Sequence, residues 1–274
     1  MKYIILFFIY LIVICSVQSE VISYQQGGNN LLVTNYQGME DNLLVGTNTR
    51  HDDNQGGYEH SIVGNSGWGT YDPPVRTIMR WDLSSLNTQY TNIESVSLTL
   101  NVSNTANSGT LSVYALSSAN KDWAEGTSFG YGIKHGESCW WYKAWDTNGN
   151  HVPWAGGVDS GAGVAGVDYN STALGTLQWN ASTSGLITIN FDGWSNTQLN
   201  NLIDLWVGSQ SENAGIILIN NIESNGTRLL WGAKERADID ERPMLSITYS
   251  NVPEPSTLFM TVCIIVISLK ILKK

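Results

Sequence analysis

The chain has 274 residues, of which 42% are hydrophobic and only 14% charged, with 11 Trp and 12 Tyr. This composition favours strands over helices and leaves enough residues for one large all-β domain. Residues 20–251 carry 23 acidic and 10 basic side chains, a net charge of −13, because the other four lysines and Glu254 lie in the terminal segments. Such a surface repels phosphate groups, which argues against a nucleic-acid partner.

Residues 1–19 have the layout of a secretory signal peptide. Lys2 is followed by an apolar run from Tyr3 to Cys15 and then by Ser-Val-Gln-Ser, and small residues at Val17 and Ser19 favour cleavage before Glu20. The alternative is an uncleaved N-terminal anchor. Both interpretations predict export by the Sec machinery, an apolar helix at the N-terminus and a folded body over residues 20–251.

Residues 75–102 predict two consecutive strands. In the first strand one face holds Val75, Thr77, Met79, Trp81 and Leu83. The other face holds Arg76, Ile78, Arg80 and Asp82 and is expected in water, because side chains in a strand alternate between faces. The second strand alternates in the same way through Val96, Leu98, Leu100 and Val102. We expect these strands to start the core of a β-sandwich.

The next part of the chain changes character after residue 126. Residues 111–116 predict a strand, whereas residues 127–170 are rich in Gly and Trp and show little periodicity. A loop of this length in a compact domain is usually functional or packed by its own side chains. Cys139 is the one cysteine of residues 20–251, so no disulfide forms within this body, and we expect a buried, unreactive thiol.

The remaining body predicts strands near 174–179, 186–191, 215–220, 227–231 and 243–249. Residues 227–231 are expected to pair with residues 215–220. Residues 195–207 predict an amphipathic helix, because Leu199, Leu202, Ile203 and Trp206 follow helical spacing after a Ser195 cap. The sequence therefore predicts an all-β, jelly-roll-like antiparallel sandwich with one short helix.

The C-terminal residues 252–274 combine Val252, Pro253, Glu254 and Pro255 with an apolar run from 257 to 269 and a basic tail. At ~1.5 Å per residue, a helix over this run covers about two-thirds of a ~30 Å hydrocarbon core. In order and position this segment resembles the PEP-CTERM sorting signal. The resemblance implies recognition and removal of the tail by an exosortase, with Val252 to Pro255 as the processing motif. A plain tail anchor is the alternative.

The order of motifs in the body resembles the DNRLRE-type domain of secreted and surface proteins. The matching pieces are YQGMEDNLL (36–44), DDNQGG (52–57), VRTIMRWDLSSL (75–86), DWAEG (122–126), PWAGG (153–157) and ERPMLSITY (241–249). The resemblance implies a jelly-roll sandwich, and some relatives bind carbohydrate. Arg80 and Asp82 match the family's Arg-aromatic-Asp signature, and we expect a structural ion pair between them.

No catalytic arrangement stands out, and we expect no enzyme. Glycoside hydrolysis needs two carboxylates at a fixed separation, which Asp122, Glu125, Glu137 and Asp146 could supply. However, residues 122–125 belong to the scaffold of the resembled family. The four histidines have no metal-ligand spacing.

Calcium is the one cofactor that the sequence raises, as a structural ion. Asp146, Asn148 and Asn150 place oxygen ligands at alternate positions around a Gly, as at the start of a calcium loop. The closing Glu of such a loop is missing, so an ordinary turn is the alternative.

The aromatic run at 139–145 supplies material for stacking on sugar rings, with Trp140, Trp141 and Trp145 as candidates. The alternative is that these rings pack the long loop onto the sandwich. We therefore expect a non-catalytic protein of the cell surface or extracellular matrix, exported and transiently anchored in the membrane by its C-terminal helix. A module that binds extracellular polysaccharide is the second interpretation.

Overall fold

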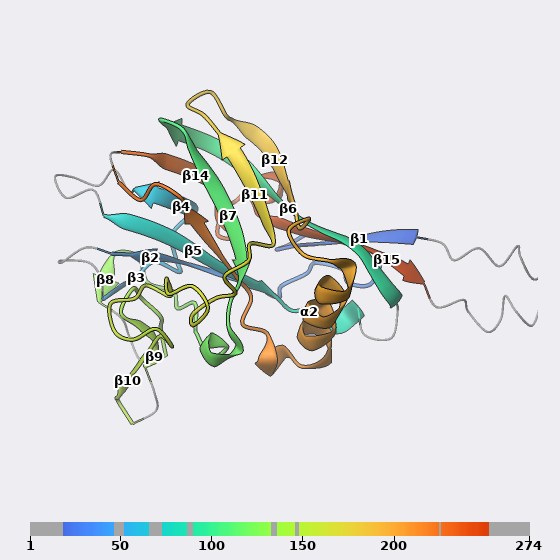
Figure 1. The fold of residues 1–274 in the computed structure, drawn as a ribbon, viewed down its shortest axis with the longest axis horizontal. Helices are drawn as coiled ribbons and strands as arrows, with labels where there is room; N and C mark the ends of the chain where they lie inside the picture. Colours follow the sequence, from blue (N-terminus) through green and yellow to red (C-terminus); the bar gives the residue numbers. More distant parts are fainter. Residues whose placement is uncertain are drawn as a thin grey trace, which may run out of the picture.

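The computed structural model describes residues 19–46, 52–65, 73–86, 90–132, 136–145, 148–224 and 226–251. This part is built of antiparallel strands, with one α-helix, α2 (Asn196–Gly208) (Figure 1). Eleven strands form one sheet: β1 (Ser19–Gln25), β2 (Met39–Val45), β4 (His60–Asn65), β5 (Pro74–Trp81), β6 (Tyr90–Ala106), β7 (Gly109–Ala115), β11 (Gly175–Trp179), β12 (Gly185–Asn190), β13 (Ile216–Asn220), β14 (Arg228–Gly232) and β15 (Met244–Asn251). Two small sheets pair β3 (Asp53–Asn54) with β8 (Tyr131–Gly132) and β9 (Tyr142–Trp145) with β10 (His151–Pro153).

The large sheet curls into a sandwich. Strands β1, β15, β6 and β12 make one layer, and β2, β5, β13, β7 and β11 make the other, while β14 and β4 link them by pairing with β6 and β5. The main core lies between the layers and contains side chains from both. The predicted all-β, antiparallel sandwich with one helix is confirmed.

The two strands predicted over residues 75–102 lie in opposite layers. Strand β5 pairs with β2, β4 and β13, whereas β6 pairs with β15, β14 and β12. Met79 and Trp81 of β5 enter the same core as Leu98 and Leu100 of β6. The inward faces are those predicted, and the two strands meet across the core.

The prediction for the second face of β5 was wrong. Ile78 on this face is fully buried, and the side chains of Arg76 and Arg80 are only 13% and 14% exposed. The described residues between 117 and 170 cover this face, so β5 is buried on both sides. Alternation of apolar and polar residues could not reveal this burial. The polar residues of the face are arginines, and they donate hydrogen bonds to backbone carbonyls of the covering segment.

Helix α2 begins where its cap predicted. The Ser195 side chain accepts a hydrogen bond from the Gln198 backbone N–H, and the Gln198 side chain accepts one from the Ser195 N–H. This reciprocal capping box satisfies N–H groups that the first helical turn leaves free. Leu199, Ile203 and Trp206 are buried on the core side of the helix.

Two local features differ from the predictions. Residues 227–231 pair with β4 and β6, and not with residues 215–220, which pair with β5 and β7. Strand β1 was not predicted. In the structure its Ile22 and Tyr24 are buried between exposed or half-exposed neighbours.

The expected terminal helices lie outside the described residues. Strand β1 begins at Ser19 and β15 ends at Asn251. Within the part of the chain that the structure describes, no helix has the length and apolar character needed to cross a bilayer.

Candidate functional site

A second hydrophobic core lies between the outer face of the β5 layer and the segment 117–170. Ile78 of β5 and Ile217 of β13 pack there with Trp123, Trp140 and Trp154, whose exposed fractions are 5% or less. The indole N–H groups of Trp123 and Trp154 each donate to a buried backbone carbonyl, at 2.8 and 2.9 Å. Apolar area and satisfied indole groups together hold the long segment on the sheet.

Arg76 fastens this segment at one end. Its guanidinium lies over the Trp140 ring, 4.6 Å from the centroid, and donates to both carboxylate oxygens of Glu223 at 2.7 and 2.9 Å. It also donates to the backbone carbonyls of residues 160 and 161. A side chain at Gly163 would begin 1.8 Å from the guanidinium, so this close approach requires glycine.

Arg80 makes a similar contact over Trp123, at 4.5 Å from the centroid. Its carboxylate partner is Glu40, which lies directly opposite on β2. The expected ion pair with Asp82 is therefore wrong, since Asp82 instead accepts a hydrogen bond from the Ser84 backbone N–H. The Arg80 guanidinium is held against the Trp123 ring, and the carboxylate within its reach there is Glu40 on the neighbouring strand.

The three tryptophans proposed for sugar stacking have different surroundings. Trp140 is 5% exposed, and a side chain on either Gly46 or Gly161 would lie within 2.8 Å of its ring. Its faces are therefore closed to a sugar. Trp141 and Trp145 are half-buried.

The half-exposed rings form an aromatic cluster on the β9–β10 hairpin, made of Trp141, Tyr142, Trp145 and His151. The His151 ring lies 4.4 Å from Tyr142 and 5.0 Å from Trp145, and Trp141 lies 6.0 Å from Tyr142. The Trp141 indole N–H donates to Asp159 Oδ1 at 3.2 Å. His151 was missed from the sequence, because only pairing of β9 with β10 brings it to Trp145.

The calcium hypothesis remains a prediction. Asn148 and Asn150 are exposed on the connection between β9 and β10. Asp146 lies outside the described residues. The structure therefore places the two amide side chains next to the aromatic cluster along the chain.

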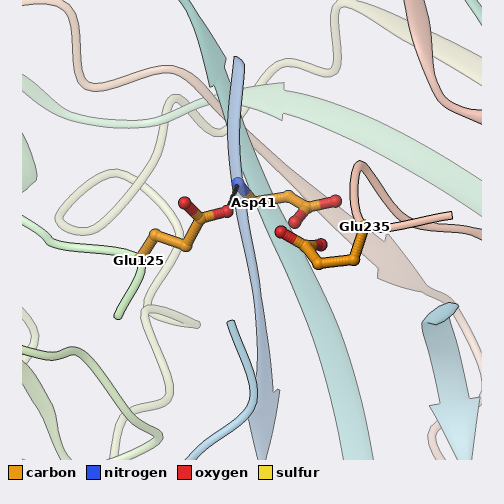
Figure 2. A group of neighbouring side chains, drawn as sticks. All are labelled: Asp41, Glu125 and Glu235. Carbon is orange, nitrogen blue, oxygen red and sulfur yellow. Dashed lines mark hydrogen bonds between the residues drawn. The ribbon is translucent and has the colours of Figure 1, made fainter. Parts of the chain in front are cut away.

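The structure instead gathers three carboxylates at another place, which we call the acid cluster: Asp41, Glu125 and Glu235. Figure 2 shows them converging from β2, from the segment after Trp123 and from the turn after β14. One oxygen atom from each lies within 4.8 Å of the others. Sequence reasoning missed this cluster, because its members come from three distant segments with no shared spacing.

Local contacts hold the acid cluster together. Glu125 Oε1 accepts a hydrogen bond from the Asp41 backbone N–H at 2.8 Å, and Asp41 Oδ2 accepts one from the Lys234 N–H at 3.2 Å. The Lys234 ammonium lies 2.8 Å from Glu125 and 3.1 Å from Glu235. One ammonium thus pairs with two of the three carboxylates, and its charge also acts on Asp41.

Burial perturbs these acids strongly. It raises the pKa of Asp41 well above its ordinary value, an effect that the charges of Glu235 and Glu125 increase. Burial also raises the pKa of Glu125 to about 7, against the opposing hydrogen bond from Asp41 and the Lys234 charge. Burial is also the main cause that raises the pKa of Glu235. The arrangement can retain a proton near neutral pH, and its oxygens are of the type that bind hard cations.

Three of the four carboxylates considered for glycoside hydrolysis have separate partners, and the fourth, Asp146, lies outside the described residues. The Asp122 side chain is exposed and lies 3.6 Å from Lys143. Glu125 belongs to the acid cluster, and buried Glu137 accepts hydrogen bonds from the Ser128 hydroxyl and the Thr127 N–H. Each is occupied by contacts that fix the loop.

The processing motif Val252, Pro253, Glu254 and Pro255 follows the last strand but lies outside the described residues. The free Cys139 is buried, as expected. Burial raises the pKa of its thiol to about 12. No protein-family model matches the chain, and no curated protein matches it in sequence.

Proposed function

We propose that this chain is a non-catalytic, exported β-sandwich protein of the cell surface or extracellular matrix, sorted through residues 252–274. We further propose that residues 20–251 are a DNRLRE-type domain. The observation that carries the proposal is the use of the segment 117–170. Trp123, Trp140 and Trp154 of this segment, and the two arginines beneath them, are taken up by packing, so these residues serve as scaffold.

The native protein tests this proposal directly. Mass spectrometry of the protein from its own cells should find Glu20 as the first residue and a C-terminus that lacks the apolar run 257–269. A Pro253→Ala/Glu254→Ala/Pro255→Ala variant should keep its tail and remain with the membrane. Pro153→Ala, on exposed β10, is the matched control and should be processed normally. Recovery of the protein from the cytosol with residues 1–19 attached would contradict the proposal.

A specific observation favours a second function, which is binding of an extracellular polysaccharide. The aromatic cluster presents four neighbouring rings that are half-buried or exposed on one hairpin. Such rings offer apolar faces and polar edges, which suit the two sides of a pyranose.

Titration of neutral and acidic oligosaccharides with calorimetric detection tests this function. Trp145→Ala should weaken binding at least about tenfold, which is about 1.4 kcal/mol. Phe129→Ala is the control, because that ring is 49% exposed and stacked on Tyr58 outside the hairpin. Equal losses in both variants, or no binding by the parent protein, would exclude a sugar site at the aromatic cluster.

A further inference from the structure

The two ends of the described body lie side by side. Strand β1 pairs antiparallel with β15 along its full length, so that Ser19 lies opposite Ser250. Ser250 in turn lies opposite Asn92 of β6. These three residues form one row across three strands, at the end of the sandwich where both terminal segments leave it (Figure 1).

The row is held by a shared carboxylate. Glu94 accepts hydrogen bonds from the Ser19 hydroxyl at 2.7–2.8 Å and from the Ser250 hydroxyl at 2.5 Å. The outer strand β1 is thus joined to β15 and β6 at the point where the chain enters and leaves. A membrane that holds the chain just after Asn251 therefore also lies beside the start of β1 and of β6.

The chain between this row and the apolar runs is short. Five residues, 252–256, separate Asn251 from the apolar run that starts at Thr257. A fully extended chain spans at most about 3.6 Å per residue, so Asn251 lies within about 22 Å of the start of that run. On the other side, residues 16–18 separate Cys15 from Ser19, which allows about 14 Å.

We infer that the end of the sandwich formed by the start of β1, the start of β6 and the finish of β15 faces the lipid bilayer while the chain is anchored, and that the β9–β10 hairpin points away from it. This inference rests on the proposed membrane anchoring of the C-terminal run. Antiparallel pairing of β1 with β15 places the start of the body beside the strand end from which the C-terminal run follows. Figure 1 shows β9 and β10 at the lower left of the molecule, and the start of β1 and the finish of β15 at the right.

Charge favours this upright orientation over one that lies flat. Residues 20–251 carry a net charge of −13, and anionic lipid headgroups repel such a surface. A body held at one end of its long axis by a short tether then keeps its far end away from the bilayer. The aromatic cluster is thereby presented to the outside.

Fluorescence quenching in vesicles measures the orientation. The chain from Glu20 to Lys274, which is the proposed exported form before its tail is removed, carries Cys263→Ser and is inserted into vesicles of phosphatidylethanolamine and phosphatidylglycerol that contain a nitroxide-headgroup lipid. A dye is attached at Asn92→Cys or at His151→Cys, both exposed positions. The native Cys139 is fully buried and stays unlabelled. We expect several-fold stronger quenching at residue 92 than at residue 151.

Two further variants make the result decisive. Val21→Cys, 57% exposed on β1, provides a second near position if the Asn92 variant fails to fold, and it should also be quenched more than residue 151. A flexible Gly/Ser insert of about 20 residues after Asn251, with an r.m.s. length of about 25 Å, should reduce the difference between near and far probes.

The outcomes separate this inference from the proposed function. Equal or reversed quenching in a chain that stays in the vesicles overturns the orientation and leaves the proposed function intact. A difference that the long insert does not reduce shows adsorption through the surface of the domain, and also overturns the inference. A chain that does not associate with the vesicles removes the proposed anchor and the orientation together.

Discussion

Replacement of Asp41 by Asn tests whether the acid cluster costs stability when it loses its proton. The amide keeps nearly the same shape, and its oxygen can accept the hydrogen bond that the Lys234 N–H now donates. The change removes a carboxylate that is 2% exposed and faces Glu125 and Glu235. We expect Asp41→Asn to raise the free energy of unfolding at about pH 8 and to change it little at about pH 5.

The sign follows from where the proton binds. Glu125 has a pKa raised from 4.5 to about 7 in the folded protein, so the folded state holds a proton that the unfolded chain releases. The stability from this group is fully present below about pH 4.5 and is lost as the pH rises to about 7. At about 1.4 kcal/mol per pKa unit, this loss is about 3 kcal/mol.

Removal of one neighbouring charge should recover part of that loss. Because the Glu125 charge is among the causes that raise the pKa of Asp41, the two acids compete for ionisation beside a single Lys234 ammonium. We therefore expect a gain of about 1–3 kcal/mol for Asp41→Asn at about pH 8, with a flatter dependence of stability on pH.

Urea unfolding followed by Trp fluorescence at several pH values measures this gain. Asp192→Asn is the matched control, because Asp192 is exposed and outside the acid cluster. The control should follow the parent protein at every pH. A loss of stability for Asp41→Asn at about pH 8, or an unchanged pH dependence, would refute the reasoning. If the loss occurred only in the presence of calcium, a bound cation would be the charge partner of the acid cluster.

Three further predictions concern packing. Trp154→Ala should cost about 3–5 kcal/mol in urea unfolding, whereas half-buried Trp141→Ala should cost clearly less; equal costs would contradict the second core. Cys139 should resist a maleimide reagent at about pH 8 until the protein is unfolded, because the thiol is buried and its pKa is raised to about 12; fast labelling of the native protein would show the burial to be wrong. Ser23→Cys/Ser246→Cys should form a disulfide, since the two hydroxyls lie 2.8 Å apart on β1 and β15; failure to oxidise would show that β1 leaves the sheet.

The sequence predicted strands well where one face of a strand meets the core and the other meets water. Alternation placed Leu98 and Leu100 inward on β6, and helical spacing with a Ser195 cap located α2. The sequence could not predict strand partners. Nothing in residues 227–231 distinguishes pairing with β4 and β6, which the structure shows, from pairing with β13. Pairing depends on how the whole sheet curls.

The candidate sites were predicted less completely, for a similar reason. The Trp-rich segment was identified, but which of its rings are closed off depends on Arg76 and on the glycines that let chain segments approach Trp140. The acid cluster was not predicted at all. Its three side chains are ordinary in their own segments, and only the approach of β2 to the turn after β14 brings Asp41 and Glu235 together.

The two proposed functions use opposite ends of the molecule, and this separates them experimentally. Tail processing concerns the end where β1 and β15 are paired, whereas sugar binding would concern the β9–β10 hairpin at the far end. Substitution of Trp145 should therefore leave both natural termini unchanged, even if it releases the protein from a matrix. Substitution of Pro253 and its neighbours should leave sugar binding in solution unchanged. A chain in which a hairpin substitution blocked tail processing would show that the two ends communicate through the sandwich, which a rigid, doubly buried β5 layer does not predict.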